Sequence, residues 1–322
     1  MYDCQKGAFL MRLAVKSGGK SAFSEWSMIF RNLMPDLNVV DWDEANHHPQ
    51  SIDFVLAWQP EGDILSRMLH LKGIISTGAG VDHIIQDPLC PRNVPIYRMG
   101  SEEISAQMAD YVLWAVLCCV RRTWRWHGAQ ATRTWLPPAP NRLAKDVTVG
   151  VMGLGHLGRS VADHLCNAGF SVRGWARSVY DLPGIHTYAG PETFPAFLKK
   201  VDVLICLLPS TPDTVGILNA RTFAALSEGA SVINVGRGSH LVEGDLLAAL
   251  NEGLIAGAIL DVFDYEPLPR ISPFWSHPQI IITPHAAAEA TRPSKAAHTV
   301  EIIKAIMRGE EGPLRYHPDK GY

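Results

Sequence analysis

The sequence is poor in the features that mark secreted, membrane-embedded and nucleic-acid-binding proteins. Its six cysteines are scattered and form no Cys-x-x-Cys pair, which argues against a disulfide framework or a metal site. No purely apolar run approaches the roughly 20 residues of a membrane span, and the first residues lack a signal peptide's apolar core. The formal net charge is only −3, so no strong field attracts nucleic acid or an anionic membrane. These absences predict a cytoplasmic protein with buried, reduced thiols. Translation could start at Met1 or at Met11.

The rest of the composition is that of a soluble globular protein, with 47% hydrophobic and 19% charged residues. The length suits two domains of about 100–200 residues each. Short apolar segments alternate with helical patterns, which predicts an α/β fold with parallel sheets. The expected strands are 9–15, 39–40, 54–58, 74–76, 147–151, 171–175, 201–207, 231–235, 256–260 and 280–282. The expected helices are 24–34, 64–68, 99–120, 194–199 and 295–307. One more leads up to 168, and another, with Leu246, Leu247 and Leu250, ends at Gly253.

The most informative stretch is VTVGVMGLGHLG, from Val147 to Gly158, which reads as a buried strand, a glycine turn and a helix start. Gly153 permits the sharp turn, Gly155 lets the backbone approach a pyrophosphate, and Gly158 lets helix and strand pack closely. The first turn of the helix offers its N–H groups to the phosphates. Glycine-rich turns also serve plain strand–helix packing. The strand before, the helix after and the later strand favour dinucleotide binding.

Two other segments carry weaker signals. The loop after residue 76 contains Gly78 and Gly80, whose N–H groups could form a nest for a carboxylate, although an ordinary turn has the same composition. The segment from Arg121 to Asn141 holds four arginines among three tryptophans, a mixture that could bind nucleic acid. Because the net charge is negative, and because tryptophan and arginine are enriched at interfaces, we expect an extended arm buried between subunits.

Three side chains with complementary chemistry lie in loops after predicted strands, where parallel sheets bind their ligands: Arg237, Glu266 and His285. Reduction of a carbonyl by hydride transfer needs a cation for an anionic substrate and an acid for the new alkoxide. Arg237 suits the first role and His285 the second, while Glu266 could hold the other imidazole nitrogen and favour the charged form. Each alone could be an ordinary loop residue. Together, downstream of the glycine turn, they favour a catalytic set.

The chain resembles the D-2-hydroxyacid dehydrogenases over nearly its whole length, and within them the glyoxylate/hydroxypyruvate reductase A group most. The family motifs are Gly78-Ala-Gly-Val-Asp82, Gly153-Leu-Gly155-His-Leu-Gly158, Asn234-Val-Gly-Arg-Gly238, Leu260-Asp-Val-Phe-Asp-Tyr-Glu-Pro267 and Thr283-Pro-His285. The group features are Val172-Arg-Gly-Trp-Ala-Arg-Ser178, Glu266-Pro-Leu-Pro269, Thr291-Arg-Pro293 and the terminal Gly321-Tyr322.

The resemblance implies two doubly wound parallel-sheet domains with the active site in the cleft between them. We expect a flavodoxin-like substrate domain at 1–103 with 288–322, and a Rossmann-type coenzyme domain at 104–287. The resemblance also implies a homodimer in which Trp135, from the arm, reaches the partner's substrate pocket. Arg237 would bind substrate and take part in catalysis, His285 would donate the proton, and Glu266 would be its partner. Ala79 and Gly80 would bind the substrate carboxylate through their N–H groups.

The expected coenzyme is NADP(H), with NAD(H) as the alternative. Members that use NAD mostly carry an acidic residue after the second strand of the coenzyme domain, about 20 positions past the glycine turn. Arg177 and Ser178 stand there in this chain and could bind a 2′-phosphate. The expected coenzyme contacts are Gly153, Leu154, Gly155, His156, Leu157, Gly158, Arg177, Ser178, Pro209, Thr214, Val235, Gly236, Asp261 and His285.

The resulting hypothesis is an NADPH-dependent reductase of small 2-keto acids, with glyoxylate and hydroxypyruvate as first candidates. A reductase of bulkier 2-keto acids on the same scaffold is one alternative, because the width of the pocket is not readable from sequence. A dinucleotide-sensing binding protein is another, since the same fold serves transcriptional corepressors. The complete set of Arg237, Glu266 and His285 disfavours that second alternative.

Overall fold

The computed structural model describes residues 11–137 and 141–321 of the chain. The chain divides into two compact units, one formed by the described residues of 1–101 and 290–322 and the other by 102–289. The boundaries expected from the sequence lie after residues 103 and 287. Phe9 and Leu10 of the first expected strand, and Tyr322 of the terminal motif, lie outside the described residues.

Unit 1 is built on a five-stranded parallel sheet with the order β2-β1-β3-β4-β5. The central strands β3 and β4 are apolar and buried along their whole length, as expected of parallel strands covered on both faces. Helix α11 comes from the C-terminal end of the chain and packs against α1. The strands are β1 Met11–Lys16, β2 Leu37–Asp41, β3 Phe54–Ala57, β4 Gly73–Ser76 and β5 Ile96–Tyr97. The α-helices are α1 Gly19–Leu33, α2 Trp42–His47, α3 Gly62–Leu65, α4 Asp82–Ile85 and α11 Arg292–Met307.

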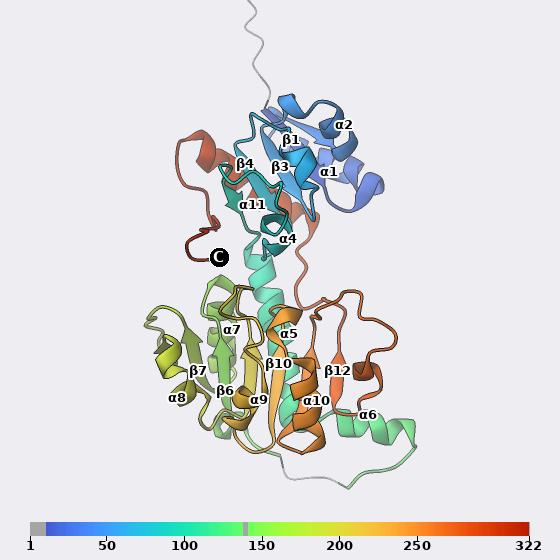
Figure 1. Ribbon diagram of the computed structural model, residues 1–322, viewed down its shortest axis with the longest axis vertical. Helices are drawn as coiled ribbons and strands as arrows, with labels where there is room; N and C mark the ends of the chain where they lie inside the picture. Colours follow the sequence, from blue (N-terminus) through green and yellow to red (C-terminus); the bar gives the residue numbers. More distant parts are fainter. Residues whose placement is uncertain (1–10, 138–140, 322) are drawn as a thin grey trace, which may run out of the picture. The chain divides into compact units, whose positions relative to one another are not determined.

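Unit 2 is built on a seven-stranded parallel sheet with the order β12-β11-β10-β9-β6-β7-β8 (Figure 1). The strand order reverses between β6 and β9, which is where doubly wound sheets bind their ligands. The strands are β6 Thr148–Met152, β7 Ser171–Ala176, β8 His186–Ala189, β9 Val203–Cys206, β10 Ala230–Asn234, β11 Ile255–Leu260 and β12 Ile280–Ile282. The α-helices are α5 Glu102–Arg121, α6 Trp124–Ala131, α7 His156–Asn167, α8 Phe194–Leu198, α9 Ala220–Ala224 and α10 Glu243–Asn251.

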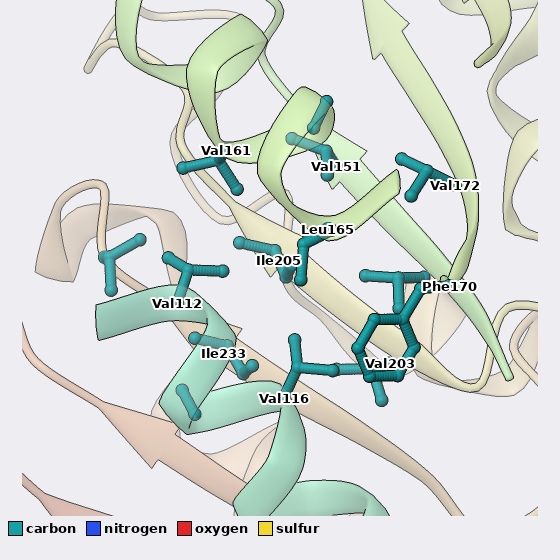
Figure 2. Close-up of a cluster of buried hydrophobic side chains, with 14 of the residues drawn as sticks. Val112, Val116, Val151, Val161, Leu165, Phe170, Val172, Val203, Ile205 and Ile233 are labelled. Carbon is teal, nitrogen blue, oxygen red and sulfur yellow. The ribbon is translucent and has the colours of Figure 1, made fainter. Parts of the chain in front are cut away.

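Two hydrophobic clusters cover the two faces of this sheet. Helices α5 and α7 supply the cluster in Figure 2, where Val112 and Val116 meet Val161 and Leu165 above the strands. Helices α8, α9 and α10 supply the cluster on the opposite face, centred on Phe197, Phe223 and Leu246. Because helices cover both faces of the sheet, a ligand cannot bind on a face. Ligands of such sheets bind to the loops at the carboxyl ends of the strands.

The segment expected to be an extended arm is partly helical, so that prediction is wrong for Trp124–Ala131. The indole of Trp124 is buried against β11 at Gly257, where an added Cβ would lie 2.6 Å from the ring. That contact spans more than a hundred residues, so the local arginine–tryptophan–proline composition could not reveal it. Sequence reasoning also missed α2, α4, β5, β8 and α9, all of them short elements.

Helix α5 is more apolar than the sequence analysis of membrane spans suggested. Within residues 11–137 and 141–321 it is the one helix long and apolar enough to cross a membrane by length and composition. Half of its most apolar stretch is buried in unit 2, where it packs on α7 and on β9, β10 and β11. The core helix of a globular protein meets the same criteria.

The cysteines of the described residues are free thiols. Cys90, Cys118, Cys119 and Cys206 are buried and Cys166 is half-buried, while Cys4 lies outside the described residues. Burial raises the pKa of Cys206 to about 12, so this thiol stays protonated and unreactive. Across the described part of the chain, no group of three or more His, Cys, Asp or Glu side chains is arranged to hold a metal ion.

Candidate active site

The glycine turn joins β6 to α7 as a close contact between backbones. Gly153 has φ 98° and an added Cβ would lie 2.7 Å from the Leu207 carbonyl oxygen, so only glycine fits this position without strain. At Gly158 an added Cβ would lie 1.8 Å from the Gly153 carbonyl oxygen. At Gly155 nothing lies within 4 Å of such a Cβ, which leaves the backbone open. Gly153 thus makes the turn and Gly158 the close packing, while the approach of a pyrophosphate at Gly155 stays a prediction.

Helix α7 begins directly after this turn with its N–H groups uncapped by any side chain. Gly155 is the N-cap residue and no acidic side chain lies in the first turn. The His156 ring is held by Ser105 of α5, with Nε2 2.9 Å from Ser105 Oγ. Leu154 is buried beneath the turn, against Gly174 of β7. The positive end of the helix dipole thus faces the carboxyl edge of the sheet beside open backbone, which fits the pyrophosphate of a dinucleotide.

Arg177 and Ser178 follow β7 immediately and both are exposed. Two residues further on, the Tyr180 ring lies under the guanidinium of Arg159 from α7, at 5.9 Å from the centroid. This end of β7 therefore presents arginine and hydroxyl groups where an acidic residue would repel a phosphate.

Arg237 lies in the loop after β10, and its backbone is fixed from several directions. The Asn234 side-chain amide donates to the Arg237 carbonyl oxygen at 2.9 Å. The Nη1 of Arg237 donates to the Gly236 carbonyl oxygen at 2.7 Å. An added Cβ at Gly238 would lie 1.8 Å from the Phe263 carbonyl carbon, so this loop lies directly against the segment that leads to Glu266. Asn234 is a residue that the sequence analysis gave no separate role.

Glu266 and His285 form the expected pair. Glu266 Oε2 lies 2.7 Å from His285 Nδ1, and Glu266 Oε1 accepts the Phe263 N–H at 2.9 Å. Both side chains are partly exposed, so the ring can be reached from outside unit 2. The carboxylate fixes the orientation of the imidazole and leaves Nε2 as the nitrogen that can face a substrate.

The loop that carries His285 is held by Asp261, which is buried at the end of β11. Its carboxylate accepts the N–H groups of Ala286 at 2.8 Å and Ala287 at 3.1 Å, and the hydroxyl of Thr283 at 2.6 Å. His285 has φ 54°, a left-handed conformation that costs a non-glycine residue about 1–3 kcal/mol. The carboxylate of Asp261 therefore stabilises a strained backbone in addition to the coenzyme contact that the sequence analysis gave it.

Tyr111 of α5 extends this network, and sequence reasoning missed it. Its hydroxyl lies 2.5 Å from Thr283 Oγ1, and because Thr283 donates to Asp261, Tyr111 is the donor to Thr283. Burial raises the pKa of Tyr111, which keeps the hydroxyl protonated as this contact requires. A tyrosine in the middle of an apolar helix carried no signal that would have found it.

The loop after β9 carries Pro209 and Thr214, two expected coenzyme contacts. Thr214 Oγ1 donates to the Pro209 carbonyl oxygen at 2.7 Å and accepts the Thr211 N–H at 2.9 Å. The threonine hydroxyl thus closes the loop on itself. Val235 is buried. A Cβ added at Gly236 would lie 3.2 Å from the Leu208 carbonyl oxygen. The loops after β9 and β10 are therefore in direct contact.

In unit 1 the loop after β4 is closed by the side chain of Ser76. The Gly78 N–H donates to Ser76 Oγ at 3.1 Å, and that hydroxyl donates to the Gly80 carbonyl oxygen at 2.9 Å. The Gly78 N–H is thus used within the loop, which favours the ordinary turn over a nest made by Gly78 and Gly80. Over the described residues the N–H groups of Ala79 and Gly80 donate no hydrogen bond, which suits the carboxylate contact that the resemblance implies.

Comparison with known proteins decides which family this arrangement belongs to. The model of the D-isomer specific 2-hydroxyacid dehydrogenase NAD binding domain matches residues 113–287. The chain belongs to the D-isomer specific 2-hydroxyacid dehydrogenase family. Over 292 residues it is 40% identical to a Yersinia enterocolitica protein named glyoxylate/hydroxypyruvate reductase A, covering 89% of this chain and 92% of that protein.

Solved structures of family members have the same fold. The D-isomer specific 2-hydroxyacid dehydrogenase from Xanthobacter autotrophicus Py2, crystallised with NADPH, gives a TM-score of 0.91 at 36% identity and covers 97% of this chain and 99% of its own. The NADPH-dependent glyoxylate/hydroxypyruvate reductase from Sinorhizobium meliloti was crystallised with NADP and sulfate. It gives a TM-score of 0.88 at 34% identity, and the match covers 97% of this chain and 100% of that one. The expected two-sheet α/β fold and the dehydrogenase class are confirmed. The roles of the individual site residues stay predictions.

Proposed function

We propose that this dehydrogenase uses NADPH to reduce small 2-keto acids, glyoxylate to glycolate and hydroxypyruvate to D-glycerate. The observation that carries the proposal is the 2.7 Å contact between Glu266 Oε2 and His285 Nδ1. The loop of Arg237 lies directly against the segment that leads to Glu266. An acid held by a carboxylate and a nearby cation are what reduction of an anionic keto acid requires. The names of the Yersinia and Sinorhizobium relatives support the same substrates.

The proposed roles follow from what each side chain can do. Arg237 would bind the substrate carboxylate and polarise the adjacent carbonyl, because its planar fork donates two parallel hydrogen bonds. His285 would give the proton that the carbonyl oxygen takes up, and Glu266 would keep the ring oriented for that transfer. Ala79 and Gly80 would add N–H donors for the carboxylate. Bound NADPH would supply the hydride.

The coenzyme fits the residues present. The turn at Gly153 and Gly155 leaves backbone open at the uncapped start of α7, which suits a pyrophosphate. Arg177 and Ser178 suit a 2′-phosphate, and two structural neighbours were crystallised with NADPH or NADP.

Oxidation of NADPH, followed by its absorbance, tests the proposal directly against a panel of 2-keto acids of increasing size. We expect turnover with glyoxylate and hydroxypyruvate and lower efficiency with longer or branched acids. A preference for bulky acids would replace the small-acid proposal with the alternative on the same scaffold. Absence of turnover with every acid, while NADPH still binds, would instead indicate a dinucleotide-sensing protein.

Replacing Arg177 with Asp is expected to lower kcat/KM with NADPH by about 10- to 100-fold, because one charge-assisted hydrogen bond is lost and a repulsive charge is added. Efficiency with NADH should fall far less. Ser178→Ala is the matched control, because it removes one hydrogen bond to the phosphate and adds no repulsive charge, and it should cost less than Arg177→Asp. Equal efficiency of the native enzyme with both coenzymes would contradict the assignment.

We further propose that the enzyme is a cytoplasmic homodimer in which the arm after α5 covers the partner. Its support is a set of large apolar side chains left exposed on α5, α6 and the following segment: Trp114, Leu117, Trp126 and Trp135. Trp135 is 94% exposed, and a large apolar side chain so exposed marks an interaction surface when it has apolar neighbours. Buried free thiols suit a reducing compartment.

Trp135→Ala is expected to raise KM for keto acids or to broaden the accepted chain length, because a pocket wall is removed. Kinetics on the keto-acid panel and light scattering measure both effects. Trp126→Ala is the control for the loss of an exposed tryptophan on the same segment. A Trp135→Ala enzyme that stays dimeric with native kinetics on every acid would leave this residue with no role in the pocket.

A further inference from the structure

His240 lies fully buried between the loops that follow β9 and β10. Its Nδ1 accepts the backbone N–H of Arg237 at 3.0 Å, and its Nε2 lies 3.2 Å from the Pro209 carbonyl oxygen. The thiol of Cys206, at the end of β9, lies 3.5 Å from the same Nδ1. One imidazole therefore contacts both the residue proposed to bind substrate and a residue proposed to contact the coenzyme.

The two contacts determine which ring nitrogen carries the proton. A nitrogen that accepts a backbone N–H has its lone pair free, so Nδ1 is unprotonated. The Pro209 carbonyl oxygen can only accept, so Nε2 must be the donor. Thr214 Oγ1 donates to the same carbonyl oxygen, which fixes it from a second side. The surroundings thus select the neutral ring with its proton on Nε2.

Backbone geometry leaves the ring little freedom to move. The His240 N–H donates to the Arg237 carbonyl oxygen at 3.2 Å, and its own carbonyl oxygen accepts the Leu218 N–H at 2.8 Å. A Cβ added at Gly236 would lie 2.9 Å from Nδ1, so the ring packs directly against the loop that carries Arg237. A displacement of the imidazole would therefore move Arg237 and Pro209 together.

We propose that His240 is a positioning residue that uses one ring nitrogen to place Arg237 and the other to place Pro209. It acts on the substrate through the arginine and on the coenzyme through the loop after β9, and it exchanges no proton in the reaction. The consequence for catalysis rests on the function proposed above, whereas the hydrogen-bonding pattern of the ring does not.

Two substitutions separate the two contacts. In His240→Asn the side-chain oxygen takes the place of Nδ1 and can accept the Arg237 N–H, but the shorter side chain cannot reach Pro209. In His240→Gln the amide reaches the position of Nε2 and can donate to Pro209, while no acceptor remains at Nδ1. Ser239→Ala is the matched control, because Ser239 Oγ lies 3.2 Å from Ser210 Oγ and joins the same two loops without contacting Arg237 or Pro209.

Steady-state kinetics with glyoxylate and NADPH should divide the two variants. We expect His240→Gln to raise KM for glyoxylate by about three- to tenfold with a smaller change for NADPH, the range expected for one lost hydrogen bond. His240→Asn should instead raise KM for NADPH more than KM for glyoxylate. The Kd for NADPH, measured by fluorescence, should rise in the same variant. Ser239→Ala should change neither constant. Equal losses in both variants, at unchanged melting temperature, would overturn the proposal.

A spectroscopic measurement tests the ring itself without any turnover. Histidine-selective ¹⁵N spectra of the protein without coenzyme, with His240 assigned by its loss in His240→Asn, report which ring nitrogen carries the proton. We expect the neutral ring protonated on Nε2. A ring protonated on Nδ1, or on both nitrogens, would overturn the proposal even if the kinetics divided as expected. If the native protein reduces no keto acid, the proposed function fails, and this spectrum still decides the placement of Arg237 and Pro209.

Discussion

Replacing His285 with Gln is expected to lower kcat for keto-acid reduction by about 10²–10⁴-fold, the usual cost of a lost general acid. The glutamine keeps a polar side chain of similar size but cannot deliver a proton to the developing alkoxide. Because the His285 backbone is held by Asp261, the loop should stay in place, and the Kd for NADPH should change far less than kcat. Single-turnover measurements would show whether the chemical step has become slower.

A suitable control for this variant is Glu266→Gln, which keeps the acid but removes the charge of its partner. It should cost much less than the loss of His285, about tenfold, because the ring loses a charge-assisted hydrogen bond while the imidazole itself remains. A His285→Gln enzyme that retained more than about a tenth of native kcat would remove His285 from the role of proton donor.

Gly158→Ala is expected to destabilise unit 2 severely. The added Cβ would lie 1.8 Å from the Gly153 carbonyl oxygen and 2.8 Å from the Gly153 carbonyl carbon, and neither backbone atom can rotate away. Helix α7 would have to move off β6 and lose its contacts through Val161 and Leu165. Overpacking of this kind costs about 3 kcal/mol, which for a unit of this size lowers Tm by about 6–12 °C.

Gly155→Ala, three residues earlier, is the matched control. Nothing lies within 4 Å of a Cβ there and the backbone is not left-handed, so Tm should stay within about 2 °C of native. The methyl group would instead stand where the pyrophosphate must approach, and Kd for NADPH should rise. Thermal unfolding and NADPH titration of both variants separate the packing role from the binding role. Equal falls in Tm would contradict the distinction.

Sequence reasoning worked best where a single residue type satisfies a backbone requirement. Gly153 and Gly158 could be assigned because only glycine tolerates the positive φ of one and the close approach of the other. Glu266 and His285 could be paired because both follow strands of one parallel sheet, whose carboxyl ends share an edge. Their motif positions made the pairing specific.

Sequence reasoning failed where a role depends on contacts between distant segments. Trp124, the buried residue of α6, packs against Gly257 of a distant strand. His240 acquires its contacts only when β9 and β10 lie side by side. Tyr111 reaches Thr283 across 172 positions of the chain. Trp124, Tyr111 and His240 lie outside every quoted motif, and the local composition at each gave no sign of these contacts.

The path of the chain through unit 1 has a consequence for its synthesis. Helix α11 packs against α1 and contributes the buried Ile302 and Ile303, yet it is made only after the whole of unit 2. At about 5–20 residues per second, the ribosome spends about 10–40 s on residues 102–289 before α11 begins. During that time α1 is without its partner helix, while unit 2 is continuous and can fold as it emerges. The N-terminal sheet is therefore the part of a nascent chain most in need of protection from aggregation.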